Sequence, residues 1–178
     1  SPTEKGYLEF TKKITQSDFS KILQTLRPGD KLKIQYPFGK FTLRPLDTKI
    51  AFLSGGIGIT PIRSITKYVV DKKLDKDIIL LYANHTVRDI VFKEDFDAMQ
   101  EEYPNLKVCH VLSEPAPGFN CVLGRINAQA IKNEIADYPQ RKFYLCGPPA
   151  MVEAMENILI GELALPAESI VTENFQGY

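Results

Sequence analysis

The chain lacks several features that would point to particular classes of protein. It has no tryptophan, only 2 histidines and only 3 cysteines in 178 residues. The cysteines, Cys109, Cys121 and Cys146, are widely spaced and form no Cys-x-x-Cys pair. This spacing argues against a disulfide framework, a zinc site or an iron–sulfur site, so we expect no bound metal.

Long apolar runs and an excess of one charge are also missing. Apolar runs such as Ile78-Ile79-Leu80-Leu81 fall far short of the roughly 20 residues that a membrane-spanning helix needs. No secretory signal pattern opens the chain, and 22 basic residues balance 22 acidic ones. We therefore expect a cytoplasmic protein with a small, neutral or anionic ligand and no nucleic-acid or membrane partner.

From residue 50 onward, short and continuously apolar segments alternate with segments of helical length. This pattern is typical of a parallel sheet that is buried on both faces. The expected strands are residues 50–54, 77–83, 106–112, 142–146 and 170–172, and the expected helices are residues 61–72, 92–103, 127–135 and 148–162. The pattern predicts an α/β domain with a doubly wound, five-stranded parallel sheet, whose ligand crevice lies at the carboxyl ends of the strands.

The preceding residues follow a different pattern. Residues 7–14 and 31–36 alternate apolar and polar side chains as strands do, and residues 19–26 have helical spacing. Arg27-Pro28-Gly29-Asp30 is typical of a turn. The pattern changes at Arg44-Pro45-Leu46-Asp47, which predicts two domains, residues 1–45 and residues 46–178.

A glycine-rich segment follows the first predicted strand of the sheet. In Gly55-Gly56-Ile57-Gly58-Ile59-Thr60-Pro61, the glycines allow a tight turn and a close approach of the backbone to a pyrophosphate. Pro61 suits the first turn of the following helix, whose amino end attracts an anion. The alternative, if this segment is taken alone, is a strand-to-helix turn that needs glycine and binds nothing.

A second motif follows the fourth predicted strand. In Cys146-Gly147-Pro148-Pro149-Ala150-Met151, Gly147 leaves space for a flat ring and the prolines begin a helix. We expect the Cys146 thiol to lie at the crevice. The alternative is that Cys146 is a small buried apolar residue, which is common for a free cysteine.

A third segment ends the chain: Glu173-Asn174-Phe175-Gln176-Gly177-Tyr178. Together, and in this order, the three segments resemble the nucleotide domain of the ferredoxin-NADP reductase superfamily. The resemblance implies one set of residues at a dinucleotide pyrophosphate, a second set beside its nicotinamide, and a third set near a flavin. The residues implied at the pyrophosphate are Gly55, Gly56, Gly58, Thr60 and Pro61. Those implied beside the nicotinamide are Gly147, Pro148, Met151 and the catalytic Cys146. Near the flavin, the resemblance implies a catalytic Glu173, with Phe175 or Tyr178 covering the flavin ring. Alternatively, the two aromatic residues pack the tail without any ligand.

The amino-terminal segment also resembles this family. Ser17-Asp18-Phe19-Ser20 opens a helix where these proteins bind the FAD pyrophosphate, which implies that Ser17 and Ser20 contact FAD. Either residue could instead serve only to cap the helix. Pro37-Phe38-Gly39-Lys40-Phe41 resembles the closing strand of the antiparallel flavin barrel. The family's Arg-x-Tyr-Ser strand would precede Ser1, so we expect an incomplete flavin domain and favour a fragment of a longer reductase over a barrel completed by another chain.

The choice between NADH and NADPH depends on the residues that meet the adenosine ribose. Ser113 and Glu114 occupy a family position where NADP-dependent members have Ser followed by Arg. Glu114 therefore places a negative charge where the 2′-phosphate would need a cation. Arg88 is a competing candidate for contact with that phosphate. We expect NAD(P)H binding with a preference for NADH.

The resemblance implies a flavin-dependent oxidoreductase of the ferredoxin reductase type. Such an enzyme passes hydride from NAD(P)H to FAD, and then electrons to a small acceptor or a redox partner such as a ferredoxin. The alternative is a non-catalytic nicotinamide-nucleotide-binding or sensing module without flavin. A Rossmann-like methyltransferase accounts less well for the chain, because it explains neither Cys146-Gly147-Pro148-Pro149 nor the aromatic tail.

Overall fold

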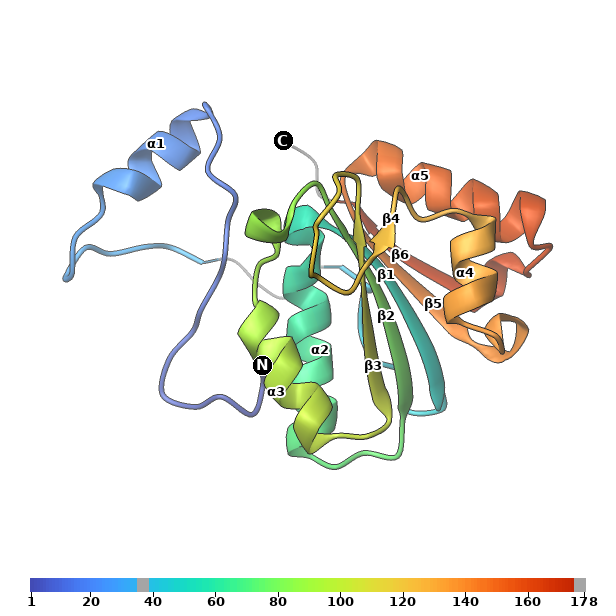
Figure 1. Ribbon diagram of the computed structural model, residues 1–178. Coiled ribbons are helices and arrows are strands. Elements are labelled where there is room, and N and C mark those ends of the chain that lie inside the picture. Colours follow the sequence, from blue (N-terminus) through green and yellow to red (C-terminus); the bar gives the residue numbers. More distant parts are fainter. Residues whose placement is uncertain (35–38, 175–178) are drawn as a thin grey trace.

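The computed structural model describes residues 1–34 and 39–174 and contains one parallel sheet (Figure 1). Its six strands lie in the order β4-β3-β2-β1-β5-β6. The strands are β1 (Lys49–Gly55), β2 (Asp77–Asn84), β3 (Leu106–Leu112), β4 (Val122–Leu123), β5 (Lys142–Gly147) and β6 (Ile170–Asn174). All neighbouring pairs run parallel, as the apolar runs predicted.

Helices cover both faces of the sheet (Figure 1). One face carries α2 (Ile59–Asp71) and α3 (Lys93–Glu102), and the other carries α4 (Ala128–Glu134) and α5 (Pro149–Asn157). Alternate residues of β1 point to opposite faces: Ile50 and Phe52 join the apolar cluster under α2, whereas Ala51 and Leu53 join the cluster under α4 and α5. Each strand therefore needs apolar residues on both sides, which explains its continuous apolar run.

The predicted elements of this domain are confirmed within a few residues of their bounds. A π-helical turn, Ile158–Glu162, continues α5, so the single helix predicted for residues 148–162 is two segments. The prediction of five strands was wrong by one, because β4 had been missed. With only two residues, β4 is too short to show any periodicity.

The amino end of the sheet is held by Arg141, which directly precedes β5. Its guanidinium donates to both carboxylate oxygens of Asp77 at 3.0 and 2.9 Å, to the Ile50 carbonyl oxygen at 3.2 Å and to an Asp137 carboxylate oxygen at 2.6 Å. Only 5% of Arg141 is exposed. One side chain thus ties β1 and β2 to the start of β5, at the end of the sheet opposite the predicted crevice.

Before β1, the described residues contain a single helix, α1 (Asp18–Thr25), which projects away from the sheet (Figure 1). The predicted turn at residues 27–30 is present, with Gly29 at a φ of 101°. The two predicted strands were wrong: residues 7–14 and 31–34 are not in strands, and residues 35–36 lie outside the described part. An alternating pattern forms a strand only beside a neighbouring strand, and this segment has none there.

Many apolar side chains before β1 consequently remain exposed. They are Tyr7, Leu8, Phe10, Ile14, Phe19, Ile22, Leu32, Ile34 and Leu46. Both ends of the segment are nevertheless attached to the α/β domain. Glu4 accepts two hydrogen bonds from Arg63 of α2 at 2.9 and 2.7 Å, and Phe41 packs edge-on against Tyr144 of β5 with ring centroids 5.4 Å apart.

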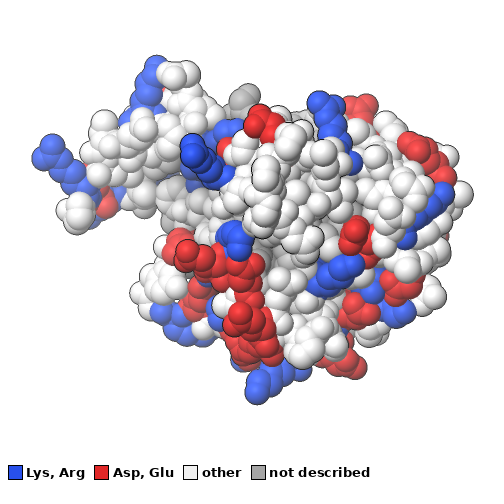
Figure 2. Space-filling view, in the orientation of Figure 1, with Lys and Arg blue, Asp and Glu red and all other residues white. Residues whose placement is uncertain are grey.

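The surface shows charges of both signs (Figure 2). Acidic side chains gather over α3, whose sequence includes Glu94, Asp95 and Asp97, but Arg63 and Lys93 pair with Asp95 and Asp97. No helix in the described part of the chain has the length and apolar character needed to cross a membrane.

Candidate functional site

The two motifs found in the sequence meet at the carboxyl edge of the sheet. A Cβ atom on Gly58 would lie 2.3 Å from the Cys146 carbonyl oxygen and 2.6 Å from the Gly147 Cα. A Cβ atom on Gly147 would lie 3.3 Å from the Gly55 carbonyl oxygen. The loop after β1 and the end of β5 are therefore in direct backbone contact, which only glycine permits.

Two other glycines of the loop have different surroundings. Met151, in the first turn of α5, lies directly over Gly55, where a Cβ atom would come within 2.1 Å of the Met151 sulfur. Gly56 has a φ of +52° and nothing within 4 Å of its Cβ position. Gly55 thus lies against the end of the Met151 side chain, which would have to move to make room for a larger residue. The outer side of Gly56 instead faces open space that a ligand could occupy.

Two helices begin at this edge without a side-chain cap. The residue before α2 is Gly58 and the residue before α5 is Pro148, and neither provides a capping hydrogen bond. Thr60 and Pro61 form the first turn of α2. The glycine loop is itself a single 3-10 turn, Gly56–Gly58, which leads directly into α2 and also starts without a side-chain cap. The N–H groups of the loop and the positive end of the helix dipole make this position favourable for an anion. The residues present therefore suit a dinucleotide pyrophosphate.

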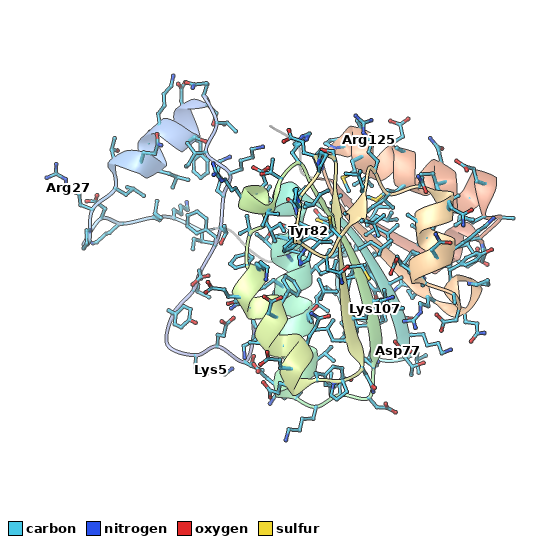
Figure 3. The ribbon with its side chains drawn as sticks, viewed as in Figure 1. Lys5, Arg27, Asp77, Tyr82, Lys107 and Arg125 are labelled. Atoms are coloured by element: carbon cyan, nitrogen blue, oxygen red, sulfur yellow. The ribbon has the colours of Figure 1, made fainter. Side chains whose placement is uncertain are left out.

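The strand register places several polar side chains in one row across the sheet. Ser54 of β1 pairs with Tyr82 of β2 on one side and with Cys146 of β5 on the other, and Cys146 pairs with Glu173 of β6. Figure 3 shows Tyr82 near the carboxyl ends of the strands and Asp77 at the amino end. The Ser54 hydroxyl is buried without a hydrogen-bond partner in the described structure.

Cys146 is enclosed in the core and its thiol is not open to solvent. The side chain belongs to the same apolar cluster as Tyr144 and Val171. Burial, with a smaller contribution from the negative charge of Glu173, raises the pKa of the Cys146 thiol to about 12. The thiol is therefore neutral near pH 7 and buried, and the Cys146 carbonyl packs against Gly58 of the loop after β1.

Glu173 lies where the amino-terminal segment returns to the sheet. A Cβ atom on Gly39 would lie 3.2 Å from a carboxylate oxygen of Glu173, so the two residues are in close contact. Glu173 is partly exposed. The other predicted flavin-site residues of the tail, Phe175 and Tyr178, lie outside the described residues.

Ser17 and Ser20 are not brought to this edge. Ser17 caps α1 by accepting a hydrogen bond from the Ser20 backbone N–H at 3.3 Å. The buried Ser20 hydroxyl accepts from the Thr15 N–H at 3.1 Å and from the Ser17 hydroxyl at 3.1 Å. Both hydroxyls thus have local partners on the projecting segment, and the described part of residues 1–45 forms no barrel and no flavin pocket by itself.

The two segments predicted for the adenosine end do lie together. A His85 ring nitrogen and the Ser113 hydroxyl are 2.9 Å apart, and the Glu114 backbone N–H donates to the His85 carbonyl oxygen at 3.0 Å. Asp89 accepts from the Thr86 N–H and hydroxyl at 2.9 and 2.8 Å. These bonds hold the Asp89 carboxylate against Thr86.

Two residues near this edge were missed in the sequence. Arg125 is exposed and follows β4, near the top of Figure 3, but the shortness of β4 hid its position. Tyr82 lies within an apolar run and looked like an ordinary core residue. Its phenol in fact contacts the glycine loop, donating to the Gly56 carbonyl oxygen at 3.1 Å.

Comparison with known proteins identifies the class of this fold and site. Residues 52–157, more than half of the chain, match the family model described as "Oxidoreductase NAD-binding domain". The chain belongs to this family, within the ferredoxin reductase-like superfamily. The match includes both glycine motifs and the two helices that begin at the crevice.

Particular relatives share the fold over most of this chain. The chain is 34% identical over 167 residues to a component of the Na(+)-translocating NADH-quinone reductase of Pseudoalteromonas atlantica, covering 89% of this chain and 40% of that protein. It is 33% identical to NADH-cytochrome b5 reductase 1 of Aspergillus terreus, and the match covers 88% of this chain and 56% of that protein. The cytochrome b5 reductase domain of Ulva prolifera nitrate reductase superposes with a TM-score of 0.80 at 26% identity. This superposition covers 88% of this chain and 66% of that domain's chain. The chain thus spans about half the length of these curated relatives.

Proposed function

We propose that this chain is the nicotinamide-nucleotide-binding part of a flavin-dependent oxidoreductase of the ferredoxin reductase type. The observation that carries the proposal is the meeting of two glycine motifs at the start of two uncapped helices. That arrangement suits the diphosphate of a dinucleotide. The relatives are named as NADH reductases, which supports hydride transfer from NADH as the reaction.

We assign the residues at the crevice to the two ends of the dinucleotide. The open outer face of Gly56 and the amino end of α2, with Gly58, Thr60 and Pro61, would hold the diphosphate. Gly147 with Pro148 and Met151 would flank the nicotinamide, with Gly55 supporting Met151 from below. The buried Cys146 would act as a neutral neighbour of the ring, because a thiol with a raised pKa is a poor nucleophile.

The flavin would accept hydride from the nicotinamide when both rings are aligned. The described residues do not form its pocket, so we assign residues 1–45 to the last part of a flavin-binding barrel and residues 46–178 to the nucleotide domain. Further polypeptide would complete the barrel. Glu173, close to Gly39, would lie on the flavin side of the site. Phe175 or Tyr178 would cover the flavin ring. Ser17 and Ser20 would face the FAD diphosphate only after rearrangement of their present hydrogen bonds.

We propose NADH over NADPH as the preferred substrate. Ser113 and Glu114 are exposed and adjoin His85, so the Glu114 carboxylate would lie at the proposed adenosine end. A carboxylate suits a free ribose hydroxyl and repels a 2′-phosphate. The names of the relatives, which specify NADH, support this preference. The electron acceptor would be a redox protein or a small molecule. That the protein is cytoplasmic stays a prediction from the sequence.

A second candidate is a nucleotide-binding module without flavin. It is favoured by the internal use of the Ser17 and Ser20 hydroxyls and by the lack of strands among the described residues before β1. Such a module would bind NADH and transfer no hydride.

One experiment separates the two candidates. The chain is produced together with a segment that completes the proposed flavin barrel, supplied with FAD, and examined by absorption before and after anaerobic addition of NADH. A flavin spectrum that bleaches on addition of NADH supports the oxidoreductase. A colourless protein that binds NADH, measured by nucleotide fluorescence, supports the module. A folded protein that binds no NADH at millimolar concentration contradicts both.

A further inference from the structure

Tyr82 joins two separate loops at the carboxyl edge of the sheet. It lies in β2, its side chain is fully buried, and it is labelled in Figure 3. Its hydroxyl donates to the Gly56 carbonyl oxygen at 3.1 Å and accepts from the Val91 backbone N–H at 3.2 Å. A single phenol thus has one partner in the glycine loop and one in the segment after β2.

The bond to Gly56 fixes the orientation of a peptide unit in the glycine loop. The Gly56 carbonyl oxygen also accepts from the Ile59 backbone N–H, so two donors hold it on the inner side of the loop. In a trans peptide the N–H points opposite to the carbonyl, so the Ile57 N–H points away from Tyr82. The positive φ of Gly56, +52°, is part of the same conformation.

The bond from Val91 extends this constraint to the adenosine side. Val91 follows a single 3-10 turn, Val87–Asp89, which begins at Thr86 with reciprocal hydrogen bonds between Thr86 and Asp89. His85, just before this turn, lies against Ser113. The phenol therefore connects the proposed diphosphate loop to the segment that borders the proposed ribose site.

Solvent cannot replace the phenol in this role. Tyr82 is fully buried, and this burial raises its pKa, so the hydroxyl keeps its proton near pH 7. Phenylalanine would fill nearly the same volume. It would leave the Gly56 carbonyl oxygen with one donor fewer and the Val91 N–H without its acceptor.

We propose that Tyr82 is a positioning residue that holds the glycine loop in its diphosphate-binding conformation and couples it to the segment around Val91. The ligand class is a nucleoside diphosphate or a dinucleotide. The inference rests on the proposed function and adds a residue that makes no direct contact with the ligand.

The test compares two tyrosine variants of the chain. In Tyr82→Phe we expect the affinity for NADH and for ADP to fall by about 5- to 10-fold, the effect of losing one or two hydrogen bonds. Tyr103→Phe is the matched control, because its hydroxyl donates to the Leu74 and Lys76 carbonyl oxygens and accepts from the Lys76 N–H, near the amino end of the sheet. Both variants should lose stability, but Tyr103→Phe should keep its affinity for both nucleotides.

Amide hydrogen exchange on the unaltered chain provides a second measurement that does not depend on the folding of a variant. ADP should increase the protection of Ile57 and Gly58 and, through Tyr82, that of Val91. Equal affinity in Tyr82→Phe and the unaltered chain would overturn the inference and leave the proposed function intact, as would protection of the glycine loop without any change at Val91. Failure of the unaltered, folded chain to bind either nucleotide at millimolar concentration would overturn both.

Discussion

Gly56 and Gly58 lie two residues apart in one loop and are glycine for different physical reasons. Gly56 has a left-handed φ and open space at its Cβ position, whereas Gly58 faces the backbone of Cys146 and Gly147. Backbone atoms cannot move aside as the end of a flexible side chain can. The two positions should therefore respond differently to the addition of one methyl group.

We expect Gly58→Ala to destabilise the protein by about 3 kcal/mol or more, the upper part of the range for overpacking. Gly56→Ala should cost about 1–2 kcal/mol for the left-handed backbone and should weaken NADH binding. Gly161→Ala, where a Cβ atom meets nothing within 4 Å, is the control. Chemical denaturation and NADH titration would measure these effects; a stable Gly58→Ala protein would contradict the packing at that position.

Cys146 should be protected from alkylation in the folded protein. Burial raises the pKa of the Cys146 thiol to about 12 and that of the Cys109 thiol to about 11, above the unfolded value near 9. Since the unfolded state loses these protons first, stability should fall as pH rises from about 9 toward 12. Labelling with iodoacetamide at pH 8, analysed by mass spectrometry, should modify both residues much more slowly than in urea. Rapid native labelling of Cys146 would show an accessible thiolate.

Glu114→Arg should shift nucleotide preference toward NADPH. The substitution removes a carboxylate and supplies a cation for the 2′-phosphate beside Ser113. One carboxylate-to-cation exchange at an exposed site should change the NADPH-to-NADH affinity ratio by about 10-fold. Titration with both nucleotides would measure the ratio, and Glu153→Arg, an exposed change on α5, is the control. An unchanged ratio would mean that the adenosine end lies elsewhere.

At the scale of whole elements, the two ends of the sheet have different tasks. The carboxyl ends carry the glycine motifs and the starts of α2 and α5. Arg141 lies at the amino ends, directly before β5, and its hydrogen bonds to Ile50 and Asp77 join that position to β1 and β2. Stability at one end and binding at the other should therefore be separable by mutation.

Arg141→Met should destabilise the fold by about 3 kcal/mol, because the Asp77 and Asp137 carboxylates and the Ile50 carbonyl oxygen lose their shared donor. Nucleotide affinity of the folded fraction should stay the same. Thermal unfolding with and without NADH would measure both quantities. Lys142→Met is the control, because it removes the charge of the neighbouring side chain at a partly exposed position. A fall in affinity without loss of stability would contradict this division of tasks.

At the scale of the molecule, the chain consists of a well-packed α/β domain and a segment with little core of its own. Side chains such as Leu8, Phe10, Phe19 and Ile34 lie before β1 and are each more than half exposed. Apolar surface of this kind marks a place where other polypeptide packs. This agrees with a barrel that further polypeptide would complete.

Trypsin should therefore cut first in the projecting segment. Exposed basic residues there include Lys13, Lys21 and Arg27, whereas the cores under α2 and α5 are closed. We expect an early product that retains the α/β domain, identified by mass spectrometry, and slower cleavage at the same sites when a segment that completes the proposed barrel is present. First cleavage within the sheet domain would contradict this division of the molecule.

Much of the α/β domain could be predicted from the sequence alone. Apolar runs, helical spacing and the positions of glycine and proline are local properties, so they predicted five strands, four helices and the edge where the motifs meet. The short β4 gave no such signal. The alternating residues 7–14 and 31–34 gave a misleading one, since a strand also needs a neighbour to pair with.

Only the tertiary structure decided how the crevice is built. The contact of Gly58 with Cys146, the burial of that thiol and the hydrogen bond from Tyr82 to Gly56 join residues that are far apart in the chain. No local pattern encodes such contacts, because they depend on which strands become neighbours and in what register. The sequence by itself determined which elements form and that their glycines lie at one edge. The packing of those elements determined which atoms meet there.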